Sequence, residues 1–252
     1  MNPRVSVIVR TFNREKYIGN TIESILAQTF EDFDLLVWDD GSSDRTVRIA
    51  CEYAKKDPRI RITPMHHQGP AKSLKAAISQ TFCPYICWVD SDDLLAPTAL
   101  EETVAILDNN SSVGLVYTDY KLINKDGVIK GSGSRCRIPF SKDRLLFDFM
   151  TFHFRLIRRS VYDQVGGIDE SIDMAEDYDL CLKLSEVTEF RHIKKPLYQY
   201  RCHPESLSRQ FRYKQIECAK TVVEHALERR GLSDRYKIHV EVRERFSLRR
   251  KW

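Results

Sequence analysis

The sequence has no long apolar run. No stretch of its 252 residues approaches the roughly 18 consecutive apolar residues that a membrane-spanning helix needs. The first residues, Met1-Asn2-Pro3-Arg4, also have neither the charged region nor the apolar core of a secretory signal peptide. These absences predict a protein without a membrane span that works in the cytoplasm.

Paired cysteines with metal-binding spacing are absent too. The seven cysteines are odd in number and scattered, and the two nearest, Cys83 and Cys87, are four residues apart. A dispersed set of this kind is typical of reduced thiols in a cytosolic protein. We therefore expect neither a disulfide framework nor a zinc site.

An excess of one charge is also missing. The chain has 40 basic and 36 acidic residues, so its net charge of +4 does not suggest a nucleic-acid partner. Hydrophobic residues make up 42% of the chain, which is ordinary for a soluble globular protein of a length that can bury a real core.

Strand and helix patterns alternate through the first ninety residues. Short β-branched or apolar runs predict strands at 5–9, 33–38, 59–63 and 85–89. Apolar residues at helical spacing predict helices between them, at 17–26, 47–54 and 70–80. This rhythm predicts a doubly wound, Rossmann-like, mostly parallel sheet with helical layers and right-handed crossovers.

Two acidic turns directly follow predicted strands, at 39–44 and 90–93. Ligands of parallel sheets bind at the carboxyl ends of the strands, so both turns are expected to face one crevice. The three carboxylates of Asp90-Ser91-Asp92-Asp93 repel one another unless a positive charge joins them, and Mg²⁺ or Mn²⁺ bridging to a diphosphate would do so. The alternatives are a solvated turn at 90–93 and an ordinary strand–turn–helix connection at 39–44.

The second half of the chain is less regular. The patterns predict a helix at 97–109, a hairpin of strands at 113–120 and 121–130 turning at 125–127, a mobile loop at 131–143, a strand at 154–157, a helical turn at 160–165, a helix at 175–185, a strand at 193–201 and helix over the last forty residues. Glu176 and Asp177 open the helix at 175–185. A carboxylate there either accepts a proton from a substrate hydroxyl or only compensates the helix dipole.

Five segments in this order resemble the inverting family 2 glycosyltransferases of GT-A fold: VSVIVRTFNR, SILAQTF, DLLVWDDGSSDRT, YICWVDSDDL, and VGGIDES with AEDYDLCLKL. The resemblance runs from about residue 5 to about residue 208. It implies one GT-A domain at 1–210, with a nucleotide-sugar-binding half at 1–95 and an acceptor and catalytic half at 96–210. A C-terminal helical extension would follow at 211–252.

The resemblance also implies a donor site and a metal site. Asp40 matches the carboxylate that hydrogen-bonds the donor base, and His203 lies in a YRxHxxSxS-like stretch that contacts metal or phosphate, unless it is an exposed loop histidine. The implied nucleotide-binding residues are Arg10, Thr11, Asn13, Asp39, Asp40, Lys72, Asp90 and Asp92. The implied ligands of Mn²⁺ or Mg²⁺ are Asp92, Asp93 and His203.

Asp177 matches the catalytic base of the family. The implied reaction inverts the anomeric carbon, with Asp177 deprotonating the acceptor hydroxyl, Glu176 orienting Asp177 or the acceptor, and the metal stabilising the departing nucleoside diphosphate. Two further side chains have open roles. His153 contacts acceptor or sugar, or is a packed or solvent-facing side chain. Arg201 pairs with phosphate or with a local carboxylate.

Other functions remain as alternatives. A nucleotidyltransferase that makes nucleotide-sugars would carry a glycine-rich loop after the first strand, where residues 10–14 contain no glycine. A binding module without activity, and one module of a longer glycan-assembly enzyme, are the others. UDP is the commonest donor nucleotide in the family, and the acceptor is a polysaccharide or other glycan, a lipid-linked glycan, a protein or a small molecule. The basic residues at 243–252 make peripheral contact with the inner membrane face, or form a solvated helix face.

Overall fold

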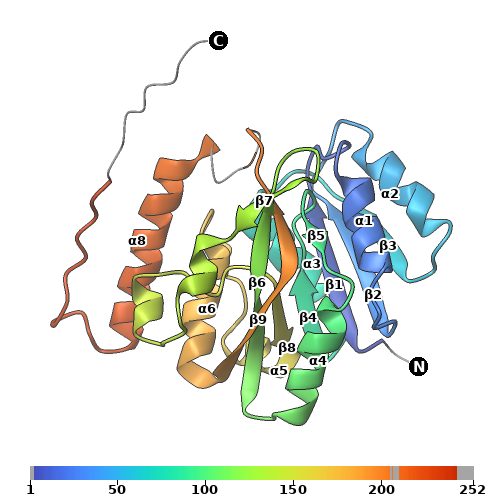
Figure 1. Ribbon diagram of the computed structural model, residues 1–252. Coiled ribbons are helices and arrows are strands. Elements are labelled where there is room, and N and C mark those ends of the chain that lie inside the picture. The colour runs from blue at the N-terminus through green and yellow to red at the C-terminus, as the bar shows by residue number, and fades with distance from the viewer. Residues whose placement is uncertain (1–2, 205, 207–209, 243–252) are drawn as a thin grey trace.

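One mixed sheet organises the molecule. The computed structural model describes residues 3–204, 206 and 210–242. Its strands follow the order β3-β2-β1-β4-β8-β6-β9-β5, with β7 attached to β6, and helices lie on both sides of the sheet (Figure 1). No helix in these residues is both long and apolar enough to cross a membrane.

The first half is the predicted parallel unit. Its elements are β1 (Val5–Thr11), α1 (Ile18–Leu26), β2 (Phe33–Asp39), α2 (Thr46–Ala54), β3 (Ile60–Pro64), α3 (Pro70–Ser79) and β4 (Tyr85–Trp88). β1 pairs in parallel with β2 and with β4, and β2 pairs in parallel with β3. Thr11 is level with Asp39, so the first two strands end together at one edge of the sheet.

The second half adds antiparallel strands to that sheet. Its elements are β5 (Leu94–Leu95), α4 (Ala99–Asn109), β6 (Val113–Ile123), β7 (Ile129–Ser132), 3₁₀ turns at Ser134–Arg137 and Arg144–Leu146, β8 (Arg155–Arg158), α5 (Arg159–Gln164), α6 (Glu176–Val187), β9 (Glu189–Arg201) and α8 (Arg212–Arg229). β8 runs antiparallel to β4 and β6, whereas β9 runs parallel to β6. The α/β prediction with a mostly parallel, doubly wound first half is confirmed.

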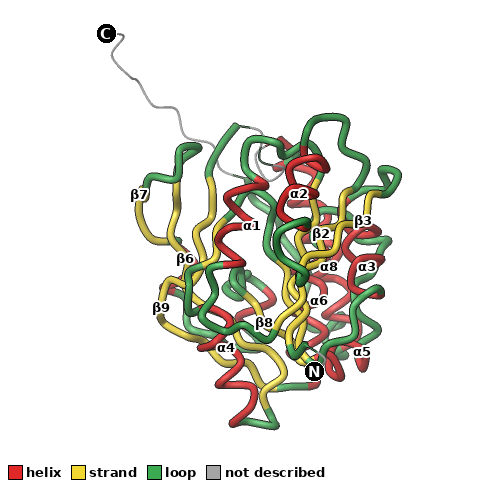
Figure 2. Tube along the Cα trace, turned by 90° about the vertical axis from the view of Figure 1, so that its right-hand side faces the viewer, coloured by secondary structure: helices red, strands yellow, loops and turns green. Residues whose placement is uncertain are grey.

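Alternate residues of the strands enter two separate cores, as the period of two requires. Ile8 belongs to a cluster that α3, α6 and α8 complete, and these helices lie together on the right in Figure 2. Its neighbours Val7 and Val9 belong to the other cluster, which α1 and α4 complete. All seven cysteines are free thiols, as predicted.

The predicted hairpin and loop after residue 113 are partly wrong. β6 continues through Lys121 to Ile123, and the turn begins at Asn124, whose side-chain oxygen accepts from the backbone N–H groups of Asp126 and Val128. The segment expected as a mobile loop at 131–143 instead packs on the sheet. Gly133 donates its N–H to the carbonyl of Tyr120, and the ring of Tyr120 lies so near Gly133 that a Cβ there would overlap it.

The predicted C-terminal extension is part of the core. α8 ends at Arg229, no helix follows in the described residues 230–242, and the basic tail at 243–252 lies outside the described residues. Val222 and Ala226 are fully buried and Leu227 nearly so, in the same cluster as α6. The predicted helix is thus present at 212–229, but its burial was not predicted, because mixed charge on the exposed face of α8 hides this short apolar stripe.

Burial of α8 predicts how two matched substitutions differ. Val222→Ala removes two methyl groups from the core and leaves a cavity, so it should lower the free energy of unfolding by about 2 kcal/mol. Val187→Ala, at a position that is 44% exposed on α6, should change it by less than about 0.5 kcal/mol. Urea denaturation measures both. Equal effects would show that α8 is not integral to the core.

Candidate active site

A cleft of about 740 Å³ opens at the carboxyl ends of β1, β2 and β4. Arg10, Asp40 and Asp90 reach it from these strands and the turns after them, and α6 contributes Glu176 and Asp177 from its first turn. Its volume is that of a pocket for a small ligand or cofactor. The two acidic turns therefore face one crevice, as the sequence predicts.

The turns after β1 and β2 are joined by hydrogen bonds between their side chains and backbone. Asn13 donates its N–H to Ser42 Oγ at 2.8 Å, and its Oδ1 accepts from the N–H of Ser43 at 2.9 Å. Arg14 donates its N–H to Thr46 Oγ1 at 2.8 Å. Asn13 has a positive φ of 51°, a conformation that asparagine tolerates better than most residues. These hydrogen bonds connect the two turns along this edge of the cleft.

Asp40 anchors a further segment of the cleft wall. Its carboxylate is 1% exposed and accepts from the N–H groups of Gln68 and Gly69 and from the hydroxyl of Ser73. It thereby holds the segment before α3 against the end of β2. The ring of His67 stacks on Phe12 at 4.4 Å between centroids, which places an aromatic surface at this rim.

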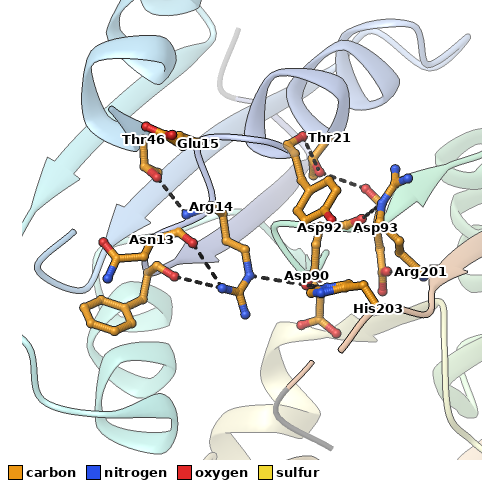
Figure 3. Close-up of polar contacts among 12 residues, drawn as sticks. Asn13, Arg14, Glu15, Thr21, Thr46, Asp90, Asp92, Asp93, Arg201 and His203 are labelled. Atoms are coloured by element: carbon orange, nitrogen blue, oxygen red, sulfur yellow. Dashed lines mark hydrogen bonds and ion pairs between the residues drawn. The ribbon is translucent and has the colours of Figure 1, made fainter. Parts of the chain in front are cut away.

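Asp92 is the best-paired carboxylate of the acidic turn. Its Oδ2 lies 2.8 Å from Nε2 of the buried His203 and 3.3 Å from Nε of Arg14 (Figure 3). Burial alone would raise the pKa of Asp92, but the hydrogen bond with His203 and the charge of Arg14 lower it. Asp92 therefore stays ionised beside the cleft.

Asp93 faces the protein interior and not the cleft. It is 1% exposed, and its Oδ1 accepts from the N–H of Arg201 at 2.6 Å. Burial, reinforced by Asp92 and Asp90, raises its pKa well above the usual value. The expectation that Asp93 binds metal does not fit this placement. Arg201 likewise serves local structure, since its guanidinium donates to the carbonyls of Asp92, Asn124 and Lys125.

Asp90 projects into the cleft beside His153. Its side chain is 40% exposed, and its Oδ2 lies 3.5 Å from Nε2 of His153. The surrounding walls exclude much of the water, which together with Asp92 and Asp177 raises the pKa of Asp90 to about 6. His153 is packed, stacking on Tyr198 at 4.7 Å, and burial holds its pKa well below the usual value. His153 is therefore a neutral neighbour of Asp90.

The first turn of α6 brings two more carboxylates to the cleft. The backbone enters it through Met174, which also lines the cleft and has a positive φ of 70°. Burial and the neighbouring Asp177 raise the pKa of Glu176 to about 7. Asp177 is 26% exposed, and its Oδ2 lies 3.0 Å from Nη2 of Arg155.

The carboxylates of the cleft fit a divalent cation only in part. Within the described residues, no group of three or more His, Cys, Asp or Glu is placed to hold a metal ion. Asp90 and Asp92 nevertheless present oxygen donors to the same cleft. Mg²⁺ is commonly held by one or two carboxylates together with substrate phosphates, so this pair fits a cation that binds with a diphosphate.

The structure divides the sequence-predicted residues into two groups. Those that line the cleft are Arg10, Asn13, Asp40, Asp90, Asp92, Glu176 and Asp177. Those outside its lining are Thr11, Asp39, Lys72, Asp93 and His203. Thr11 and Asp39 are buried at strand ends, and Lys72 borders a smaller neighbouring pocket of about 220 Å³.

Several residues of the cleft were not predicted. Phe12 and Arg14 flank the predicted Asn13 and were open to prediction from that segment, whereas nothing in the local sequence points to Phe211 at the start of α8. Arg155 was missed as the partner of Asp177, because only the fold brings β8 against the first turn of α6.

Comparison with known proteins assigns this sheet, with carboxylates gathered at its strand ends, to the glycosyltransferases. The family model for glycosyl transferase family 2 matches residues 6–166, and the chain belongs to this family. It is 34% identical to the chondroitin synthase of Escherichia coli over 230 residues, which cover 91% of this chain and 33% of that protein. It is 32% identical to the hyaluronan synthase of Pasteurella multocida over 231 residues, covering 92% and 24%. The chain thus spans a third or less of these relatives.

Solved structures share the fold at lower identity. S. aureus TarS 1–349 in complex with UDP-GlcNAc is 22% identical with a TM-score of 0.72, over 87% of this chain and 65% of that one. A mannosyltransferase from Pyrobaculum calidifontis in complex with GDP-Man and Mn²⁺ is 15% identical with a TM-score of 0.64, over 94% and 77%. The expected GT-A fold is confirmed.

The raised pKa of Glu176 predicts a pH-dependent cost in stability. An unfolded glutamate ionises near pH 4.5, whereas the folded one does so near pH 7, so the native protein loses stability as pH rises through this window. Glu176→Gln should therefore be stabilising by up to about 3 kcal/mol at pH 8 and by little at pH 5. Denaturation at both pH values, with Glu228→Gln at an exposed position as control, measures this. If the free energies of unfolding of the wild type and of Glu176→Gln changed in parallel with pH, the raised pKa of Glu176 would be contradicted.

Proposed function

We propose that the chain is an inverting glycosyltransferase module that moves a sugar from a nucleoside-diphosphate sugar to an acceptor hydroxyl in glycan or polysaccharide synthesis. The observation that carries this proposal is one cleft that contains Asp90 and Asp92 from the donor half and Asp177 from α6. The named relatives, a chondroitin and a hyaluronan synthase, support a polysaccharide acceptor.

The nucleotide would bind at the rim made by the turns after β1 and β2. Phe12 and His67 offer an aromatic surface for a base, and Arg10 offers a positive charge near the phosphates. Asp40 would act on the base largely through the segment at 67–69 that it anchors, since its oxygens already accept protein hydrogen bonds. UDP is the proposed nucleotide, supported by the UDP-GlcNAc in the TarS complex.

Asp90 and Asp92 would hold Mn²⁺ or Mg²⁺. When bound, such a cation neutralises charge that develops on the departing diphosphate. We assign His203 the role of orienting Asp92 through their hydrogen bond, and Asp93 that of fastening the turn to the end of β9. The Mn²⁺ in the mannosyltransferase complex supports use of a divalent cation.

Asp177 would be the general base. Its carboxylate takes the proton of the acceptor hydroxyl while that oxygen forms a bond to the anomeric carbon from the face opposite the diphosphate. The bond between the anomeric carbon and the diphosphate oxygen breaks, its electron pair leaves with the nucleoside diphosphate, and configuration inverts. Positioning and charge neutralisation lower the barrier. Glu176, uncharged in part near neutral pH, can donate a hydrogen bond to the acceptor.

Replacement of the base tests this proposal. Asp177→Asn keeps the size of the side chain but cannot accept the proton. Transfer from UDP-sugars to glycan acceptors should therefore fall by about 1,000-fold or more, the order of magnitude that a general base contributes. UDP affinity by calorimetry should change less than threefold. Asp163→Asn, at an exposed site on α5, is the charge-matched control and should transfer at the wild-type rate. Wild-type transfer by Asp177→Asn would remove Asp177 from the chemistry.

A further inference from the structure

Arg155 is a buried cation directly behind Asp177. Its side chain is 2% exposed, with the guanidinium 5.3 Å from the ring centroid of Trp88 and 5.5 Å from that of Phe149. A buried charge is costly unless it is paired and hydrogen-bonded. Nη2 meets that need by pairing with Asp177 Oδ2 at 3.0 Å. The buried guanidinium therefore depends on Asp177 for its compensating negative charge.

The other guanidinium nitrogens fix the direction of this contact. Nη1 donates to the carbonyl of Thr151 at 3.2 Å and contacts Cys181 Sγ at 3.7 Å. Cys181 lies one turn after Asp177 on α6, so Arg155 contacts two successive turns of this helix. Although burial opposes its charge, the attraction of Asp177 raises the pKa of Arg155 above its usual value. The guanidinium is a fixed, permanently charged fork.

Arg155 also links Asp177 to the sheet that carries the donor site. It is the first residue of β8, where it pairs with Tyr117 of β6. The same strand pairs with β4, which leads directly into the turn that bears Asp90. Strand pairing and this side-chain contact therefore connect Asp177 to the strand that leads to Asp90, in addition to the packing of α6 in the core.

We propose that Arg155 is the positioning residue of Asp177. It engages Oδ2, which leaves Oδ1 of the partly exposed carboxylate to face the acceptor hydroxyl in the cleft. The inference rests on the proposed role of Asp177 as base. A guanidinium suits this task because Nη1 is fixed by Thr151 and Cys181 while Nη2 contacts Asp177, an arrangement that the single ammonium of a lysine does not reproduce.

Several charged or titratable groups interact with Asp177 or with its carboxylate neighbours. Asp177 interacts with Arg155 from β8, with Glu176 and Cys181 from α6, and with Asp90 after β4. Arg10 from β1 interacts with Asp90 and Glu176. Of the two cations, Arg155 alone makes a direct contact with Asp177 among the interactions described.

Arg155→Met and Arg155→Lys test the proposal. A base displaced by about 1 Å costs roughly 100-fold in rate, so kcat of Arg155→Met should fall about 100-fold while UDP affinity and KM for the donor stay within threefold. Arg155→Lys keeps the positive charge but not the two-nitrogen guanidinium, so its kcat should lie between those of the wild type and Arg155→Met. Arg158→Met is the matched control on the same strand, because Arg158 donates to the carbonyls of Leu107 and Val113 away from the cleft. It should lose stability and keep kcat.

Introducing each Arg155 change into Asp177→Asn separates this inference from the proposed function. A residue that acts through Asp177 should have less than a threefold effect on the residual rate in that background. Wild-type kcat in folded Arg155→Met, or in Arg155→Lys if the methionine variant does not fold, overturns the positioning role. So does an equal loss in the Asp177→Asn background. Full transfer by Asp177→Asn alone would instead overturn the proposed function.

Discussion

Repulsion between carboxylates at one edge of the sheet is the constraint around which the site is built. Parallel strands bring Asp90 and Asp92 to the cleft, and α6 adds Glu176 and Asp177. Exclusion of water, reinforced by the neighbouring like charges, raises the pKa of Asp90 to about 6 and that of Glu176 to about 7. The native fold maintains a cluster that is unfavourable on its own, which is typical of a site prepared for a cation and an anionic ligand.

The remaining structure distributes compensating charge so that each carboxylate has a distinct state. Arg14 and His203 keep Asp92 ionised, whereas Arg155 engages Asp177 from within the core. Asp93 is withdrawn to hold the end of β9. These three aspartates thus acquire different roles through their burial and their partners.

Sequence patterns predicted the parallel half because each strand and helix there carries its own period and its own turn. They also placed Asp40, Asp90 and Asp92 in one cleft, since strand ends share an edge, whereas Asp177 was assigned only through the family resemblance. They did not show that Asp93 turns inward, because that depends on the turn closed by the N–H of Asp93 on the carbonyl of Asp90. Arg155 was not found for a similar reason: a lone arginine opening an apolar strand reveals its partner only after β8 and α6 have packed.

The central claim is that the cleft binds a nucleoside diphosphate together with a divalent cation. Calorimetry of the wild-type chain with UDP, first with Mn²⁺ and then with EDTA, tests it most directly, with GDP, CDP and dTDP as comparison nucleotides. The account predicts that one nucleotide binds and that its affinity falls at least tenfold in EDTA, because the carboxylates then repel the diphosphate. Equal affinity in EDTA would contradict a role for the cation, and no binding of any nucleotide would contradict the donor site.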